Sequence, residues 1–253
     1  MSNQNGLLRL VSPSKDSEAS GSAEDRRRNQ MSRRTYVESD HSVENLEFIR
    51  KHAKPGAIIL IGGTRLLESV IRHAQRMASD GSKNLWSHIC VYQGIREDGS
   101  LWMHEVDLDF REFKLIKGYM ESPVENVNDP KRYANIAIMD FSLTTSQRKF
   151  LFSQIKKFAQ RQTNYSILAV LKSFFYAILG KRSNIFKKRY DERVPGTCSS
   201  FVRGLYLKLG IDLAPGVDVQ ATFPEDIFRT PLLHQRHLII RQCRRKRNPP
   251  QAA

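Results

Sequence analysis

The sequence has little cysteine and no long apolar run. Its 253 residues include three cysteines, Cys90, Cys198 and Cys243, and so sparse and odd a set does not build a disulfide framework. No segment reaches the roughly 18 apolar residues that a membrane-spanning helix needs, and the N-terminal stretch lacks the apolar core of a signal peptide. We therefore expect a cytoplasmic protein in a reducing compartment.

Acidic residues are also scarce relative to basic ones. The chain holds 26 Asp and Glu against 41 Lys and Arg, a net charge of +15, which favours an anionic partner. Many of the basic residues lie in two clusters, at 26–34 and at 241–247. These clusters are either solvated tails or a tether to an anionic surface, so association with a membrane surface is an open alternative.

Changes in composition divide the chain into three parts. Residues 1–44 are polar, Ser-rich and charged without sustained periodicity, which predicts a disordered tail. Residues 45–240 carry the periodic apolar segments and are predicted to form one domain. Residues 241–253 are predicted to form a basic C-terminal tail.

Within the domain, strands and helices are interspersed and no internal repeat occurs. Asp98-Gly99 marks a hairpin turn between two runs of β-forming residues. Apolar runs and turn residues predict strands at 57–61, 85–93, 101–107, 132–142 and 237–240, and helices at 42–52, 64–79, 144–161, 167–179, 198–209 and 222–227. This mixture predicts an α+β domain.

Cys198 is the first candidate for a chemical role. Pro195-Gly196-Thr197 turns the chain immediately before it, and an apolar-periodic run follows to Leu209. Cys198 is therefore predicted at a helix N-terminus, where backbone N–H groups and the helix dipole stabilise a thiolate and can receive an oxyanion. The alternative is a structural cysteine, since a lone helical cysteine is more often a small buried residue.

A nucleophilic cysteine needs a base, and the base needs an orienting partner. His88 lies mid-strand between apolar residues, and Glu105 lies on the strand that the predicted hairpin pairs with it. A cross-strand carboxylate can reach an imidazole and fix its tautomer, so His88 is the candidate base and Glu105 its orienter. The alternatives are that His88 is a core residue, and that Glu105 is an exposed charge with His104 as the inward residue.

Together, four stretches resemble the permuted papain-like cysteine hydrolases, most closely the YiiX/YebB-type branch of the NlpC superfamily, which also includes lecithin:retinol acyltransferase. They are Pro55-Gly-Ala-Ile-Ile-Leu, Trp86-Ser-His-Ile-Cys-Val-Tyr, Met103-His-Glu-Val and Gly196-Thr-Cys-Ser-Ser-Phe-Val. Thr222-Phe-Pro-Glu-Asp-Ile resembles a further family motif. The similarity covers about residues 54–230 and depends on the order and spacing of these motifs.

The resemblance implies a circularly permuted papain-like (NlpC-type) fold, with an antiparallel sheet packed against helices and the nucleophile helix near the C-terminus. It implies a thiol-dependent hydrolase of the amidase, peptidase or lipid acyl hydrolase class. Cys198 would be the nucleophile, His88 the general base and acid, and Glu105 the orienter. Tyr165 resembles a family tyrosine that assists the oxyanion. No metal or cofactor is expected.

Two positions depart from the family pattern. Ala57 stands where the family usually has Asp after the glycine, and Cys90 stands where it has Gly or Ala two residues after the histidine. Strand alternation places Cys90 on the same face as His88. Cys90 is therefore either a second thiol at the site or, as we expect, a residue that fills a small packing slot.

The substrate is less constrained than the site. Residues 166–180 are apolar nearly all round, which predicts either a core helix or a wall that binds an acyl chain. We expect a small-molecule, lipid or peptide substrate with an amide or ester bond, and either hydrolysis or acyl transfer. The alternative function is a catalytically inactive binding module whose basic surface contacts an anionic membrane or nucleic acid. Nucleic acid is the less favoured partner, because the chain lacks zinc-ligand spacing and an aromatic RNA-binding motif.

Overall fold

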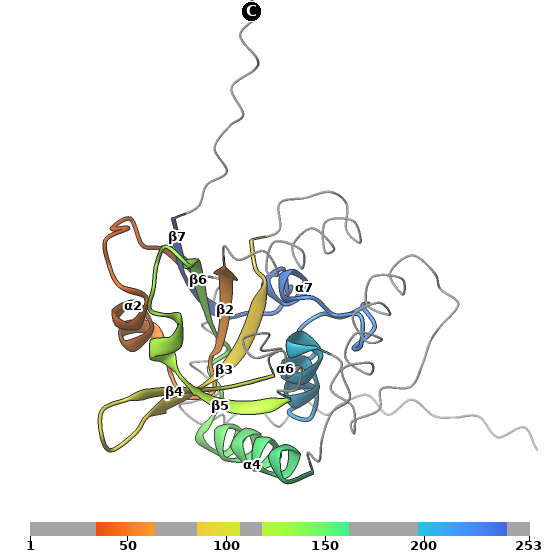
Figure 1. Ribbon diagram of the computed structural model, residues 1–253. Helices are drawn as coiled ribbons and strands as arrows, with labels where there is room; N and C mark the ends of the chain where they lie inside the picture. The colour runs from red at the N-terminus through yellow and green to blue at the C-terminus, as the bar shows by residue number, and fades with distance from the viewer. Residues whose placement is uncertain (1–33, 64–84, 107–117, 162–196, 242–253) are drawn as a thin grey trace, which may run out of the picture. The chain divides into compact units, whose positions relative to one another are not determined.

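The computed structural model describes residues 34–63, 85–106, 118–161 and 197–241 (Figure 1). In these ranges the strands are β1 (Arg34–Val37), β2 (Ile58–Gly63), β3 (His88–Ile95), β4 (Leu101–Val106), β5 (Tyr119–Pro123), β6 (Tyr133–Asp140) and β7 (Gln235–Ile240). The helices are α2 (Asn45–His52), α4 (Thr145–Arg161), α6 (Cys198–Leu207) and α7 (Pro224–Phe228), with a 3-10 turn, η1 (Val124–Val127). The domain is of the α+β class, as the sequence predicts.

One seven-stranded sheet carries these elements, in the order β1-β7-β6-β2-β3-β4-β5. The strand pairings among the described residues are antiparallel except that of β1 with β7, which is parallel. The sheet is therefore mixed, whereas the family resemblance implies an antiparallel one. The difference arises at β1, which is short and exposed along its whole length, so no apolar alternation marks it in the sequence.

Side chains of the central strands alternate between two buried clusters, one on each face of the sheet. In β2, Ile58 and Leu60 belong to the cluster that contains residues of α6, and Ile59 and Ile61 belong to the cluster that contains residues of α2. We call these the α6-side core and the α2-side core. Figure 1 shows α2 and η1 on one side of β2 and β3, and α6 on the other. Burial on both faces explains why β2 is a continuous apolar run in the sequence.

No helix within the described ranges combines the length and the apolar character that crossing a membrane requires. The helices predicted at 64–79 and 167–179 lie outside these ranges.

Both predicted domain boundaries lie too far inward. At the N-terminal end, β1 begins at Arg34, inside the range predicted to be a disordered tail. Helix α2 begins after Glu44 rather than after Ser42. At the C-terminal end, the sequence predicts that a basic tail begins at Arg241, but the backbone N–H of this residue donates to the side chain of Asn135 in β6 at 3.0 Å. The ordered domain therefore extends beyond residues 45–240 at both ends.

Arg241 joins the two ends of the domain. Its guanidinium donates to the carbonyl oxygen of His41 at 2.9 Å, to Oδ1 of Asn45 at 2.6 Å and to the carbonyl oxygen of Val43. Asn45 is buried, and its Nδ2 donates to the carbonyl oxygen of Val127 at 2.7 Å. A guanidinium suits this position because its fork of N–H donors can serve several acceptors from one side chain.

Replacing Arg241 by Ala is expected to lower the free energy of unfolding by about 2 kcal/mol, because hydrogen bonds to a charged group contribute roughly 1.5–3 kcal/mol. Urea denaturation measures the loss. Arg50 is an exposed arginine of α2, and Arg50→Ala is the matched control, with an expected change within about 0.5 kcal/mol. Equal losses in the two variants would contradict the structural role given to Arg241.

Candidate active site

The start of β3 is fixed against the end of β2. Ser87 donates its backbone N–H and its hydroxyl to the carbonyl oxygen of Ile61, at 2.9 and 3.2 Å, and its Oγ accepts from the Gly63 N–H at 3.1 Å. The segment before β3 also approaches β2 closely at Gly62, where an added Cβ would lie 2.4 Å from the carbonyl oxygen of Leu85. These contacts hold the backbone immediately before the first residue of β3.

That first residue, His88, forms a hydrogen-bonded pair with Glu105 of β4. His88 Nε2 and Glu105 Oε2 are 2.7 Å apart, and the two side chains are 18% and 8% exposed. The strand register, with Val91 opposite His104, makes them diagonal neighbours on one face of the sheet. The contact that the hairpin predicts is present, and Glu105 is not an exposed charge.

The pair determines which imidazole nitrogen of His88 carries the proton. A carboxylate only accepts hydrogen bonds, so the bond to Glu105 places the His88 proton on Nε2 and makes Nδ1 the basic nitrogen. The low exposure of both side chains strengthens the interaction, because little water screens it. Glu105 therefore has the geometry needed to orient His88.

Cys198 is the first residue of α6, and this helix has a reciprocal cap. Thr197 Oγ1 accepts from the Ser200 N–H at 3.2 Å, and Ser200 Oγ accepts from the Thr197 N–H at 2.8 Å. The sequence predicts the helix start at Cys198. It does not reveal that Ser200 completes the cap, because a serine is a less usual partner than Glu or Gln at this position.

The backbone around Cys198 offers two hydrogen-bond donors. The N–H groups of Ser200 and Phe201 donate to Thr197. The N–H groups of Cys198 and Ser199 have no acceptor in the part of the chain that the structure describes. Unbonded N–H groups occur in the first turn of every α-helix, and here they belong to the candidate nucleophile and the residue after it. The Cys198 Sγ itself lies 3.9 Å from the Ser199 hydroxyl oxygen.

The structure brings the Cys198 helix against the strand of the candidate base, but it does not join the two side chains. Phe201 of α6 shares the α6-side core with Ile89 of β3. His88 lies opposite Ile61, a residue of the α2-side core, so strand alternation directs His88 and Ile89 to different faces. Among the described residues, no hydrogen bond links Cys198 to His88.

Two further residues, Cys90 and Tyr165, are singled out by the sequence. Cys90 is fully buried in the α2-side core, with its Sγ 3.4 Å from Met103 Sδ and 3.7 Å from the carbonyl oxygen of Ile59. It fills a packing slot, as expected. Tyr165 lies outside the described residues.

His104 is also buried, on the opposite face of β4 from Glu105. Its Nδ1 lies 2.9 Å from the Tyr119 hydroxyl oxygen. Burial lowers the pKa of His104 to about 4, against the opposing effect of the Glu121 carboxylate. A histidine with this pKa is neutral near pH 7, so His104 is a core residue. The sequence leaves open whether Glu105 or His104 is the buried residue of this strand. In the structure both are buried, on opposite faces of β4.

Comparison with models of known protein families finds no match for this chain, and comparison with curated protein sequences finds none either. Within the described ranges, no group of three or more His, Cys, Asp or Glu side chains is placed to hold a metal ion. The site is therefore interpreted from its own geometry.

The lowered pKa of His104 predicts that stability falls in acid. A histidine titrates near 6.5 in the unfolded chain and near 4 at this position in the folded protein. Below pH 6.5 the unfolded chain binds more protons, so the free energy of unfolding decreases as the pH falls. The full contribution of neutral His104 to the free energy of unfolding is present above pH 6.5. About 3 kcal/mol of this free energy is lost by pH 4.

Urea denaturation at a series of pH values measures this loss. A His104→Phe variant keeps a ring among the aromatic neighbours and removes the titration. Its stability is expected to fall less steeply than that of the parent protein between pH 6.5 and 4. Parallel pH profiles for the two proteins would show that His104 is not a source of acid sensitivity.

Proposed function

We propose that the protein is a thiol-dependent acyl hydrolase or acyltransferase, in which Cys198 is the nucleophile, His88 the general base and Glu105 the residue that orients His88. The observation that carries the proposal is the 2.7 Å bond between His88 and Glu105, two largely buried side chains. The strand that bears His88 packs against the helix that bears Cys198. The proposal includes the permuted papain-like fold, with which the α+β architecture is compatible.

In the proposed reaction, His88 Nδ1 removes the thiol proton of Cys198, and the thiolate attacks the carbonyl carbon of an ester or amide. The N–H groups of Cys198 and Ser199 stabilise the oxyanion. The intermediate collapses and expels the alcohol or amine, which takes the proton from His88, and the acyl group remains as a thioester on Cys198. Water or a second acceptor then attacks the thioester, with His88 again accepting a proton.

This mechanism requires Cys198 and His88 to meet when the substrate binds. Helix α6 packs on the face of β3 that carries Ile89, whereas strand alternation directs His88 to the other face. The mechanism therefore requires the backbone at the start of β3 or of α6 to rearrange, so that the two side chains meet at the end of the sheet. Hydrogen bonds between catalytic groups are often long or absent in a free enzyme and form in the substrate complex.

The proposed substrate is a lipid-like ester or amide at an anionic membrane surface. The net charge of +15 favours such a surface, because it attracts anionic headgroups. A peptide amide is the alternative substrate. In either case the proposed location is the cytoplasm or its membrane surface.

A second candidate function is a binding module that has the fold without the chemistry. It is favoured by the lack of a hydrogen bond between Cys198 and His88 among the described residues. In this function the basic surface would contact an anionic membrane, and Cys198 would be a structural cysteine. The two functions make opposite predictions for the reactivity of Cys198.

Alkylation of Cys198 by iodoacetamide distinguishes them. If His88 meets Cys198 and accepts the thiol proton when this small amide reagent binds, His88→Ala is expected to slow alkylation at pH 6.5 by about tenfold or more. The rates of parent and variant should converge at pH 9.5, where hydroxide removes the proton in both. Peptide mass spectrometry resolves each cysteine. Rates that do not depend on His88 at either pH would favour the binding module.

Turnover of a panel of acyl esters and amides tests the chemistry itself. Cys198→Ala is expected to abolish turnover, and Glu105→Gln to reduce kcat by about 10² or more, because the amide no longer fixes the imidazole tautomer. Circular dichroism checks that both variants keep the fold. His104→Phe is the matched control on β4, and its kcat is expected to stay within about twofold of the parent. Full turnover by Cys198→Ala would rule out the mechanism.

A further inference from the structure

Helix α4 has an outer face that is basic and lacks acidic residues. The helix spans Thr145–Arg161, and its sequence, TSQRKFLFSQIKKFAQR, contains no Asp or Glu. Its inner face is fixed by Leu151 and Ile155, which are buried in the α6-side core. Figure 1 shows α4 at the margin of the described elements, next to β5 and α6. The opposite side of the helix is therefore turned away from the core.

Helical periodicity collects the exposed residues of α4 on this outer side. Residues at positions i, i+7 and i+8 belong to one stripe of a helix, and Lys149, Lys156 and Lys157 have this spacing. All three lysines are exposed. The other exposed residues of the helix are uncharged, namely Thr145, Ser146, Phe150, Ser153 and Gln160. We call these eight residues the α4 outer face.

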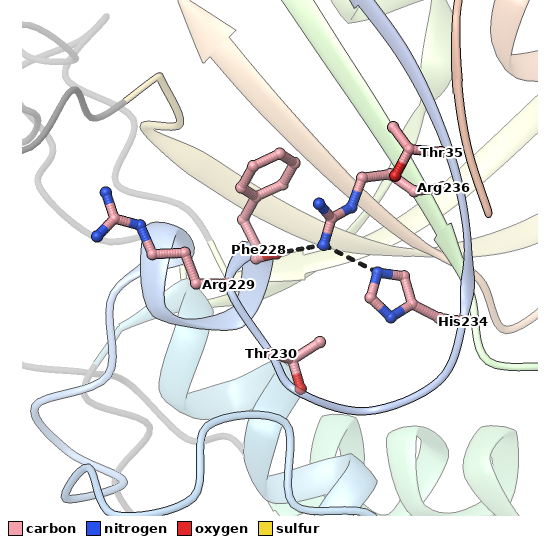
Figure 2. Close-up of a pocket in the computed structure, with 6 residues that line it drawn as sticks. All are labelled: Thr35, Phe228, Arg229, Thr230, His234 and Arg236. Atoms are coloured by element: carbon pink, nitrogen blue, oxygen red, sulfur yellow. Dashed lines mark hydrogen bonds between the residues drawn. The ribbon is translucent and has the colours of Figure 1, made fainter. Parts of the chain in front are cut away.

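The three lysines of this face have no acidic partner in the part of the chain that the structure describes. Other basic side chains are engaged. Lys54 forms an ion pair with Asp140 at 3.0 Å. In the cavity beside β1 and β7, Arg236 is hydrogen-bonded to the carbonyl oxygen of Phe228 and to His234 (Figure 2). The α4 lysines differ from these residues because they present their charge to solvent.

Phe150 adds an aromatic ring to the α4 outer face. It is 43% exposed, whereas Phe152 and Phe158 of the same helix pack against the α6-side core. An apolar ring beside lysines is typical of helices that lie on a membrane, where the ring enters the boundary between headgroups and acyl chains. Duplex nucleic acid attracts the lysines equally well but offers no apolar layer for the ring. The combination therefore favours a lipid surface.

We propose that the α4 outer face docks on the surface of a membrane that contains anionic phospholipids. Lys149, Lys156 and Lys157 contact the headgroups, and Phe150 inserts between them. The charges are complementary, and each lysine near an anionic membrane strengthens binding by roughly fivefold. Lysine suits this role because its long apolar stem lets the ammonium group reach the headgroups while the ring lies deeper.

The inference rests on the proposed function in one respect, since it locates the surface through which the membrane association of that function occurs. Helix α4 contacts α6, the helix that begins at Cys198. Docking through α4 therefore holds the helix of the candidate nucleophile close to the lipid. The docking itself does not require the chemistry of Cys198.

Cosedimentation of the full chain with vesicles tests the proposal. Phosphatidylcholine vesicles that contain phosphatidylserine are expected to bind the chain, and added sodium chloride should weaken this binding. A double variant, Lys149→Gln with Lys156→Gln, should lose about 25-fold in affinity, because each lysine contributes roughly fivefold. Glutamine is as good a helix former as lysine, and circular dichroism checks that the fold is kept.

The matched control is the double variant Arg50→Gln with Lys51→Gln. It also removes two exposed charges, from α2 on the other face of the sheet. Its affinity should stay within about threefold of the parent, because charges more than a Debye length from the membrane are largely screened. Equal losses in the two double variants would overturn the proposal, since binding would then follow net charge alone.

Phe150→Ala tests the insertion of the ring. Affinity for the anionic vesicles is expected to fall about fivefold, because apolar surface no longer leaves water on binding. Ile95 is 57% exposed in β3, and Ile95→Ala is the matched control with no expected loss. An equal effect of the two substitutions would contradict the insertion of Phe150.

Two further measurements separate the docking surface from the proposed chemistry. Cys198→Ala should bind anionic vesicles as the parent does, and the α4 double variant should keep its turnover of soluble esters. Vesicle binding that does not depend on Lys149 and Lys156, with turnover intact, would overturn the docking surface alone. Binding of a DNA duplex that depends on these lysines, without binding of anionic vesicles, would overturn the assignment to a membrane.

Discussion

Side-chain alternation along β3 and β4 is the constraint on which the candidate site depends. Successive residues face opposite sides of the sheet, so His88 and Glu105 share one face while Ile89 and His104 occupy the other. This alternation brings an imidazole and a carboxylate within 2.7 Å and leaves the opposite face for α6. A shift of one residue in the strand register would direct His88 to the opposite face of the sheet, away from Glu105. The hydrogen bonds of Ser87 to β2 hold the register in place.

The two ends of the domain meet at one edge of the sheet and stabilise each other. Strand β1 pairs with β7, and Arg241 binds the segment that precedes α2. The same edge carries the cavity around Arg236, because Thr35 of β1 stands opposite that arginine. In the part of the chain that the structure describes, Arg236 and Arg241 are basic residues of the C-terminal end that have defined hydrogen-bond partners.

Local patterns made part of this structure predictable. The run around Ile59 and the turn at Asp98-Gly99 identify strands from neighbouring residues alone, and the hairpin then brings Glu105 to His88. Strand β1 could not be found in this way, because its exposed residues have no apolar pattern and its pairing depends on β7. The partners of Arg241 are equally distant in the sequence. The relation of Cys198 to His88 also depends on how a helix packs against the sheet, which spacing along the chain does not determine.

The central claim is that Cys198, His88 and Glu105 act as one unit, and the most direct test is the ¹⁵N NMR spectrum of the His88 imidazole at neutral pH. In the parent protein we expect the tautomer with the proton on Nε2. Glu105→Gln should mix the two tautomers. With an acyl amide bound, Cys198→Ala should shift the Nδ1 resonance, because the thiol is the proposed partner of that nitrogen in the substrate complex. Identical His88 resonances in the parent protein and in Cys198→Ala, both with the amide bound, would contradict the account.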